Sequence, residues 1–274
     1  MNLRLRIGDL EVNRLGFGAM RVIDNEDIWG EPKDRANALR VLRRAVELGV
    51  QLIDTAESYG PRTDEVLIAE ALHPYPKGLV IATKGGLARP SPGRWDADCR
   101  PEKLKRDLAG SLKRLKLERI DLYQLHTVDP KVPLEDSVGA LADMQREGKI
   151  RHIGLSNVTV KQLERARKIV PVVSVQNRYS VGDRASEDVL LHCETQGIAF
   201  LPWYPLGDGA ALRRSKVISV AAKIGATPAQ LAIAWLLRKS PVMLPIPGTG
   251  NLAHLEENMA AAKLKLGDED FRSL

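Results

Sequence analysis

The chain has 274 residues, of which 44% are hydrophobic, and a formal net charge of +6 from 41 basic and 35 acidic residues. This length can bury one large core, and scattered charge without an aromatic-interleaved basic tract argues against nucleic-acid binding. No apolar run approaches the length of a membrane span. Cys99 and Cys193 have neither metal-ligand spacing nor the density of a disulfide framework, which indicates free thiols in a reducing cytoplasm. We expect a cytoplasmic monomer without a metal site, folded as one domain over residues 1–274.

The first predicted element is a β-hairpin. Residues 1–12, MNLRLRIGDLEV, alternate in character and turn at Gly8-Asp9, which differs from the basic-then-apolar layout of a signal peptide. Eight short apolar runs follow, each of a length typical of a buried strand. They are RLGFG (14–18), LID (52–54), LVIAT (79–83), IDLYQL (120–125), IRHIGLS (150–156), VVSVQ (172–176), IAFLP (198–202) and VMLPI (242–246).

Amphipathic helices are predicted between these strands, because apolar residues recur there at spacings of three and four. The clearest series are Leu104, Leu108, Leu112 and Leu115, and Leu134, Val138, Leu141 and Met144. Gly49 and Gly148 stand where helices end, and Thr227-Pro228-Ala229-Gln230 has the pattern of a capping box. Eight apolar strands alternating with helices over about 250 residues predict an α/β fold, a closed (β/α)8 TIM barrel. An open doubly wound sheet is the structural alternative.

Residues suited to catalysis or ligand binding, most of them polar, follow the predicted strands at their C-terminal ends. They are Asp54, Lys84, His126, Ser156 and Asn157, Gln176, Trp203, and Gly248 with Thr249. In a (β/α)8 barrel this face holds the active site, so these residues are expected to converge. Taken singly, Asp54 has an ordinary interpretation as a helix cap, Tyr59 as a loop aromatic, Lys84 as a solvated lysine and His126 as a core histidine. Four different titratable types at one rim favour a catalytic site.

The remaining histidines and one further carboxylate receive structural interpretations. His152 begins its predicted strand, at the opposite end of the barrel, and His73 and His192 lie on or beside helices. Glu57, between Asp54 and Tyr59, is interpreted as a loop carboxylate.

The chain resembles the aldo-keto reductases. The segments that carry the resemblance are DTAESYG (54–60), IATKGG (81–86), LYQLHTVDP (122–130), GLSNVT (154–159), VQNRYS (175–180) and LPIPGTGNLAHLEEN (244–258). They stand in the family's order and cover nearly the whole chain. The resemblance implies a (β/α)8 barrel whose bottom is covered by the N-terminal β-hairpin. It also implies NADPH-dependent reduction of aldehydes or ketones by a catalytic tetrad of Asp54, Tyr59, Lys84 and His126.

Carbonyl reduction explains why these four residue types occur together. The alkoxide that hydride addition produces needs a proton and a hydrogen-bond donor, and Tyr59 can supply the proton. The pKa of a free tyrosine is about 10, so an ammonium group on Lys84 would favour the tyrosinate. Asp54 would keep Lys84 charged, and neutral His126 would donate to the carbonyl oxygen.

The resemblance also implies a set of cofactor contacts. Ser156, Asn157 and Gln176 match the positions that bind the nicotinamide carboxamide, and Trp203 matches the aromatic residue on which the ring stacks. Tyr204 is a further expected cofactor-binding residue, and Pro205, Leu206 and Gly207 would follow the pyrophosphate. Gly248, Thr249, Gly250 and Asn251 lead into a helix N-terminus suited to phosphate, and Glu257 and Asn258 match adenine-binding positions.

The expected cofactor is NADPH, with NADH bound less tightly. This chain carries Gly248 and His254 where many family members carry lysine and arginine against the 2′-phosphate. Thr249, Asn251 and backbone amides are the alternative ligands, with Arg213, Arg214 or Lys216 nearby.

The substrate is predicted only as a class. Residues 88–98, with Trp95, and Trp29 in the first loop are candidate pocket walls. Only 16 residues follow Asn258, which predicts an open site for small aldehydes or activated ketones. Two other functions stay open: a Schiff-base aldolase at Lys84, which would need a neutral amine, and a low-turnover NADPH-sensing protein with the same barrel.

Overall fold

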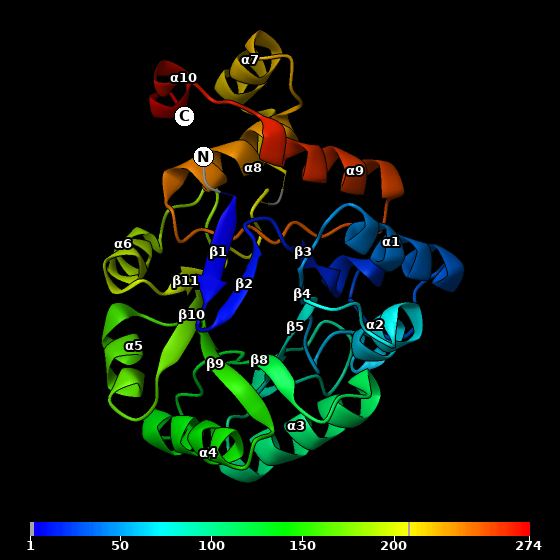
Figure 1. The fold of residues 1–274 in the computed structure, drawn as a ribbon, viewed down its shortest axis with the longest axis vertical. Helices are drawn as coiled ribbons and strands as arrows, with labels where there is room; N and C mark the ends of the chain where they lie inside the picture. Colours follow the sequence, from blue (N-terminus) through cyan, green and yellow to red (C-terminus); the bar gives the residue numbers. More distant parts are fainter. Residues whose placement is uncertain (1–2, 208) are drawn as a thin grey trace.

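Parallel strands curl into a barrel at the centre of the protein, and helices surround it (Figure 1). The computed structural model describes residues 3–207 and 209–274. The main sheet runs in the order β11-β10-β9-β8-β5-β4-β3. Its strands are β3 (Phe17–Gly18), β4 (Leu52–Asp54), β5 (Val80–Gly85), β8 (Ile120–Leu125), β9 (Ile150–Ser156), β10 (Val172–Gln176) and β11 (Ala199–Phe200). Each overlaps a predicted run, and the closed barrel is confirmed over the open sheet.

The eighth predicted strand, 242–246, is an irregular extended segment that closes the barrel. Leu244 N–H donates to the carbonyl oxygen of Phe200 on β11 at 2.8 Å. On the other side, Gly16 N–H donates to the carbonyl oxygen of Pro245 at 3.0 Å. Pro245 and Pro247 have no N–H to donate, so this segment joins both neighbours without forming a regular ladder.

Helices follow the strands along the chain and cover the outside of the barrel. They are α1 (Arg35–Glu47), α2 (Thr63–Leu72), α3 (Pro101–Leu115), α4 (Leu134–Arg146), α5 (Val160–Arg167), α6 (Glu187–Gln196), α7 (Ser215–Lys223), α8 (Pro228–Lys239), α9 (Leu252–Ala260) and α10 (Asp268–Arg272). Short 3-10 helices are η1 (Ala19–Val22), η2 (Ala211–Arg213) and η3 (Ala261–Lys263). The predicted capping box at Thr227 is confirmed, with both reciprocal hydrogen bonds to Gln230.

Within 3–207 and 209–274, no single helix combines the length and the apolar character needed to cross a membrane. Among the helices of these described residues, the pair α7 and α8, bent by 87°, meets that test of length and composition when the two are taken together.

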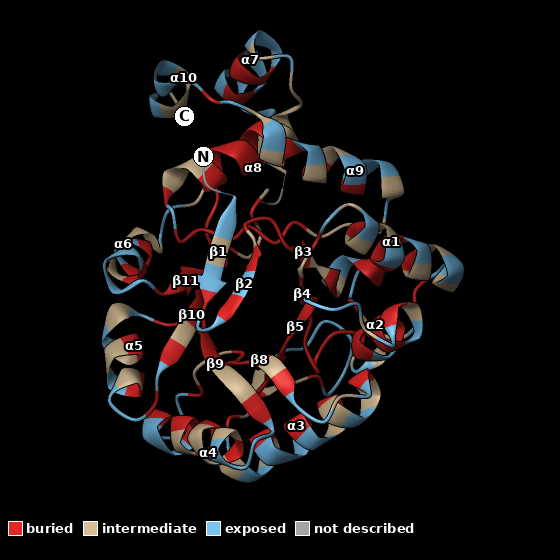
Figure 2. Cartoon of the chain, in the orientation of Figure 1, coloured by how far each residue is buried: buried red, intermediate tan, exposed pale blue. Residues whose placement is uncertain are grey.

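Alternation along the strands divides the buried residues into two sets. Figure 2 shows buried residues along the strands and on the inner sides of the helices, with exposed residues outside. Ile53, Ile81 and Tyr123 belong to the core between sheet and helices, whereas Leu52 and Val80 belong to a smaller core inside the barrel. Because side chains alternate with a period of two, Asp54 and Lys84 fall on the inner side, above that smaller core.

The predicted hairpin closes the lower end of the barrel. Strands β1 (Arg4–Ile7) and β2 (Leu10–Asn13) pair in antiparallel fashion around Gly8, whose φ of 62° suits the turn. Ile7, Leu10 and Val12 pack in the inner core. Asp9 accepts a 2.7 Å bond from Arg151 near the start of β9, which places the hairpin at the end opposite Asp54.

Candidate active site

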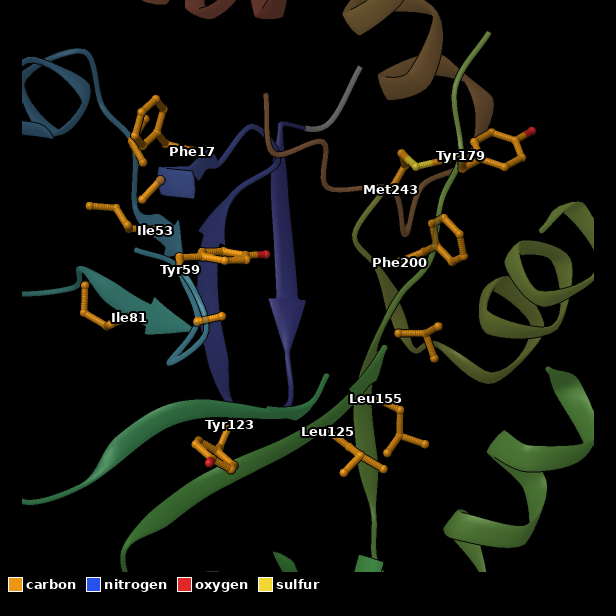
Figure 3. Packing of buried hydrophobic residues seen from close by; sticks show 14 of the residues in the cluster. Phe17, Ile53, Tyr59, Ile81, Tyr123, Leu125, Leu155, Tyr179, Phe200 and Met243 are labelled. Carbon is orange, nitrogen blue, oxygen red and sulfur yellow. The ribbon is translucent and has the colours of Figure 1, made fainter. Parts of the chain in front are cut away.

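A buried lysine joins two of the predicted catalytic residues. Lys84 Nζ donates to Asp54 Oδ2 at 2.6 Å, to the Thr55 carbonyl oxygen at 2.9 Å and to Tyr59 Oη at 3.2 Å. Its side chain is fully buried. The adjacent strands β4 and β5 bring Asp54 and Lys84 together, and the loop after β4 places the Tyr59 hydroxyl over them. Figure 3 shows the Tyr59 ring lying across the barrel, whereas Ile53, Ile81 and Tyr123 point outward.

The charges in this group support one another. Burial raises the pKa of Tyr59, and the neighbouring Lys84 opposes that rise. Burial alone would lower the pKa of Lys84, but the Asp54 carboxylate and Tyr59 outweigh it, and the pKa of Lys84 lies above its usual value. Lys84 is therefore an ammonium ion at neutral pH, held beside the phenol it can stabilise as a phenolate.

His126 lies beside Tyr59 and is neutral. Its ring meets the Tyr59 ring edge-on, with centroids 5.7 Å apart. Burial, and then the charge of Lys84, lower the pKa of His126 well below its usual value. The Ser58 hydroxyl lies 3.3 Å from Nδ1. If Ser58 donates this bond, Nε2 carries the proton and is the donor available to a ligand.

These groups open into a cavity of about 780 Å³ at the C-terminal ends of the strands. The predicted residues that line it are Asp54, Tyr59, Trp95, His126, Ser156, Asn157, Gln176, Trp203, Tyr204, Pro205, Leu206, Gly207 and Gly248. Gly93, from the predicted wall segment 88–98, lines it too. The wall also contains residues that were not predicted: Gly18, Met20, Arg21, Glu26, Asp27, Ile28, Leu87, Thr127, Ile246 and Pro247. Lys84, Trp29, Thr249, Gly250, Asn251, His254, Glu257 and Asn258 do not line it.

Asn157 connects the predicted catalytic residues with the predicted cofactor residues. It has a φ of 57°, a left-handed conformation that is uncommon outside glycine and that occurs at functional sites. Its Nδ2 donates to the His126 carbonyl oxygen at 3.0 Å, and its Oδ1 accepts from Trp203 Nε1 at 2.9 Å. The Trp203 ring is thereby oriented at the cavity wall.

The residues that are predicted to bind the adenosine part of the cofactor lie outside the cavity, and two of them already make hydrogen bonds within the protein. Asn251 caps α9, since its Oδ1 accepts from His254 N–H at 3.1 Å. The His254 side chain is exposed. The Glu257 carboxylate accepts from the Thr227 hydroxyl, so a purine there would share this carboxylate with the cap of α8.

Arg89 belongs to the predicted wall segment 88–98 but does not line the cavity itself, and it supports Trp95, which does. Its guanidinium lies 3.5 Å from the centre of the Trp95 ring and 5.4 Å from that of Trp29. It donates to the carbonyl oxygens of Asp27 at 2.6 Å and Ser58 at 3.2 Å. Arg89 therefore ties the β5–α3 loop, which holds the small hairpin β6 (Leu87–Ala88) and β7 (Asp96–Ala97), to the loop before α1. Trp29 packs behind Arg89.

Comparisons with known proteins agree with this geometry. Residues 14–274 match the model of the aldo/keto reductase family, and the chain belongs to that family. It is 48% identical over 271 residues to an uncharacterized oxidoreductase of Schizosaccharomyces pombe, covering 98% of this chain and 88% of the relative. It is 43% identical over 274 residues to the pyridoxine 4-dehydrogenase of Escherichia coli, covering 98% and 96%. A crystal structure of an aldo/keto reductase from Klebsiella pneumoniae, in complex with NADP and acetate, matches with a TM-score of 0.83 and 25% identity over 99% and 94% of the two chains.

Proposed function

We propose that this protein reduces aldehydes or ketones to alcohols with NADPH, and that Tyr59 supplies the proton. The observation that carries the proposal is the hydrogen bond from a buried Lys84 ammonium to the Tyr59 hydroxyl at the cavity wall, at 3.2 Å. NADPH, when bound, supplies the hydride. The residues of this chain then have to orient the carbonyl, protonate its oxygen and stabilise the charge that remains.

Hydrogen-bond direction supports Tyr59 as the donor. The phenolic oxygen accepts from Lys84, so its own hydrogen is free to point at a carbonyl oxygen in the cavity. As the carbonyl carbon gains the hydride, the carbon–oxygen π bond becomes an oxygen–hydrogen bond to the proton of Tyr59. The phenolate left behind faces the Lys84 ammonium. His126 Nε2–H would hold the same oxygen and set the pose of the substrate.

Several wall residues suit a nicotinamide cofactor. The Trp203 ring is oriented by Asn157, and Ser156 and Gln176 line the cavity beside the catalytic residues. The stretch from Tyr204 to Gly207 and Gly248 line the same cavity, as expected for residues that follow a pyrophosphate. The Klebsiella pneumoniae relative holds NADP, which supports the same cofactor here.

The Schiff-base alternative is disfavoured by the surroundings of Lys84. An aldolase lysine attacks as a neutral amine, but the three hydrogen bonds of Lys84 are those of an ammonium ion. Its side chain is fully buried and does not line the cavity. The low-turnover sensor would have the same architecture, and turnover is the property that separates it from a reductase.

The substrate is proposed to be a small aldehyde, with pyridoxal as the first candidate. The relative from Escherichia coli is a pyridoxine 4-dehydrogenase, and 43% of its aligned residues are identical to this chain. The part of the cavity wall near Tyr59 holds the Trp95 ring, 6.4 Å from the Tyr59 ring. Asp27 and Glu26 line the same cavity. An aromatic ring with nearby carboxylates suits a flat, protonated heteroaromatic aldehyde.

The test is an absorbance assay at the nicotinamide band with a panel of aldehydes and ketones that includes pyridoxal. Each compound is measured with NADPH and with NADH. We expect NADPH-dependent turnover with small aldehydes. Tight NADPH binding without turnover across the panel would refute the reductase proposal and favour the sensor.

A further inference from the structure

Two glutamine side chains hold the oxygen of Asp54 that does not face Lys84. Gln124 Nε2 donates to Asp54 Oδ1 at 3.0 Å, and Gln176 Nε2 donates to the same oxygen at 2.8 Å. A second bond runs from Gln176 Nε2 to Gln124 Oε1 at 3.3 Å. The three side chains therefore form a closed ring of hydrogen bonds inside the barrel. Gln124 is fully buried, and Asp54 and Gln176 are each 2% exposed.

This ring fixes the orientation of both amides. Rotating the Gln124 amide by half a turn would put its oxygen against Asp54 Oδ1 and its NH₂ against the NH₂ of Gln176. Rotating Gln176 would put its oxygen against two acceptors. Because the carboxylate accepts but cannot donate, only the observed arrangement satisfies all three groups. The part of the Gln176 amide left for a ligand in the cavity is then the acceptor Oε1.

The strand next to Gln124 leaves room for it. A Cβ atom on Gly154 of β9 would lie 2.9 Å from Gln124 Cγ and 2.3 Å from Ser174 Oγ. Glycine at this position therefore lets a long polar side chain from β8 reach Asp54 on β4 across the interior. Neighbouring positions of the inner layer below are apolar, including Leu122 on the same strand.

We propose that Gln124 is a positioning residue for this reaction, which aligns the Asp54 carboxylate with Lys84 and at the same time orients the Gln176 amide toward the cofactor. The inference rests on the proposed function, because it assigns Gln176 Oε1 to the carboxamide NH₂ of a nicotinamide. Gln124 is fully buried and does not line the cavity, so it would act through Asp54 and Gln176.

The proposal predicts a link between Gln124 and the proton on Tyr59. The charged groups around the Tyr59 hydroxyl are Lys84 from β5, Asp54 from β4 and Asp64 from α2, and His126 beside it is neutral. Negative charge on Asp54 raises the pKa of Tyr59. The two amide donors disperse part of that charge, so removal of one should make Tyr59 harder to deprotonate.

The experiment compares Gln124→Met with the parent protein in both directions of the reaction. Methionine keeps the length of the side chain but has no N–H donor. We expect the pH profile of alcohol oxidation, which needs the tyrosinate, to move upward by about half a unit or more. The KM for NADPH should rise, and kcat/KM should fall by about tenfold. An unchanged pH profile in a folded Gln124→Met variant would overturn the proposal.

Gln124→Glu is the second variant, because it keeps the shape and donates only when protonated. The rate of carbonyl reduction by Gln124→Glu should equal that of the parent protein at low pH. It should then fall as pH rises, over a range in which the rate of the parent protein does not change. If Gln124→Met fails to fold, this profile decides, and a profile like that of the parent would overturn the proposal.

Ser174→Ala is the matched control. Ser174 is fully buried on β10 beside the same glycine, and within the described part of the chain its hydroxyl has no hydrogen-bond partner. The control should keep the pH profile and the KM of the parent. If it shifts both as Gln124→Met does, general repacking explains the result and the proposal fails. Failure of the parent protein to turn over any carbonyl would instead refute the proposed function.

Discussion

Asp64 is a buried carboxylate whose ionisation should destabilise the protein. It lies in the first turn of α2, which follows the loop that holds Tyr59, and is 0% exposed. Its Oδ2 accepts from the Thr55 hydroxyl at 2.6 Å. Across residues 3–207 and 209–274, no hydrogen-bond partner reaches its Oδ1. Burial, with a smaller contribution from Glu65, raises the pKa of Asp64 from 3.8 to about 7.

The sign of the stability change follows from this shift. Between pH 4 and pH 7 the folded state holds the Asp64 proton and the unfolded state does not, so stability falls as pH rises. Each pKa unit corresponds to about 1.4 kcal/mol, and the full shift corresponds to a penalty on the order of 4 kcal/mol above pH 7. Asparagine resembles the protonated acid in shape and charge. Asp64→Asn should therefore be more stable than the parent at pH 8 by up to about 4 kcal/mol, and nearly equal to it at pH 4.

The assay is urea unfolding of both proteins at pH 4.5 and pH 8, followed by tryptophan fluorescence and far-UV circular dichroism. Glu70→Gln on the same helix is the control, because Glu70 is exposed and its ion pair with Arg35 contributes no more than about 1 kcal/mol. The reasoning is refuted if Asp64→Asn is equally or less stable than the parent at pH 8. It is also refuted if the gain at pH 8 is no larger than the gain at pH 4.5.

Three further predictions concern the proposed reaction. Tyr59→Phe should retain less than about a tenth of parent turnover while binding NADPH near normally, because the hydroxyl meets the substrate; stopped turnover with lost cofactor binding would contradict that role. Lys84→Met should be more damaging than Asp54→Asn, and the double variant should be little slower than Lys84→Met alone, because the two residues act as one unit. Turnover in all four proteins checks this, and losses that multiply would show that Asp54 acts independently. His254→Arg should tighten NADPH binding more than NADH binding by adding a fixed charge near the start of α9; equal changes in the two dissociation constants would exclude a 2′-phosphate site there.

The sequence by itself determined the architecture and predicted which residues gather at the candidate catalytic site. Apolar runs of strand length, alternating with helical periodicity, are local signals, and they predicted the parallel barrel. The C-terminal ends of the strands in such a barrel share one face, and this rule predicted from the sequence that Asp54, Lys84 and His126 lie at one site. The capping box at Thr227 was equally local, because its donors and acceptors lie within four residues.

Tertiary structure alone decided which polar groups meet across the barrel. Gln124 in LYQLH was a visible polar residue in an apolar strand, but its partners Asp54 and Gln176 lie 70 and 52 residues away in sequence. Arg89 stands in the predicted wall segment 88–98, but its bonds to the backbone carbonyls of Asp27 and Ser58 in other loops could not be predicted from the sequence. The irregular path of residues 242–247 depends on hydrogen bonds to the strands on both sides. The carbonyl oxygens of Pro245 and Pro247 accept bonds from Gly16 and Gly18, and Leu244 N–H donates to Phe200. These contacts join residues that are far apart in sequence and that come within about 3 Å only when the barrel closes. No periodic pattern along the chain therefore predicts them.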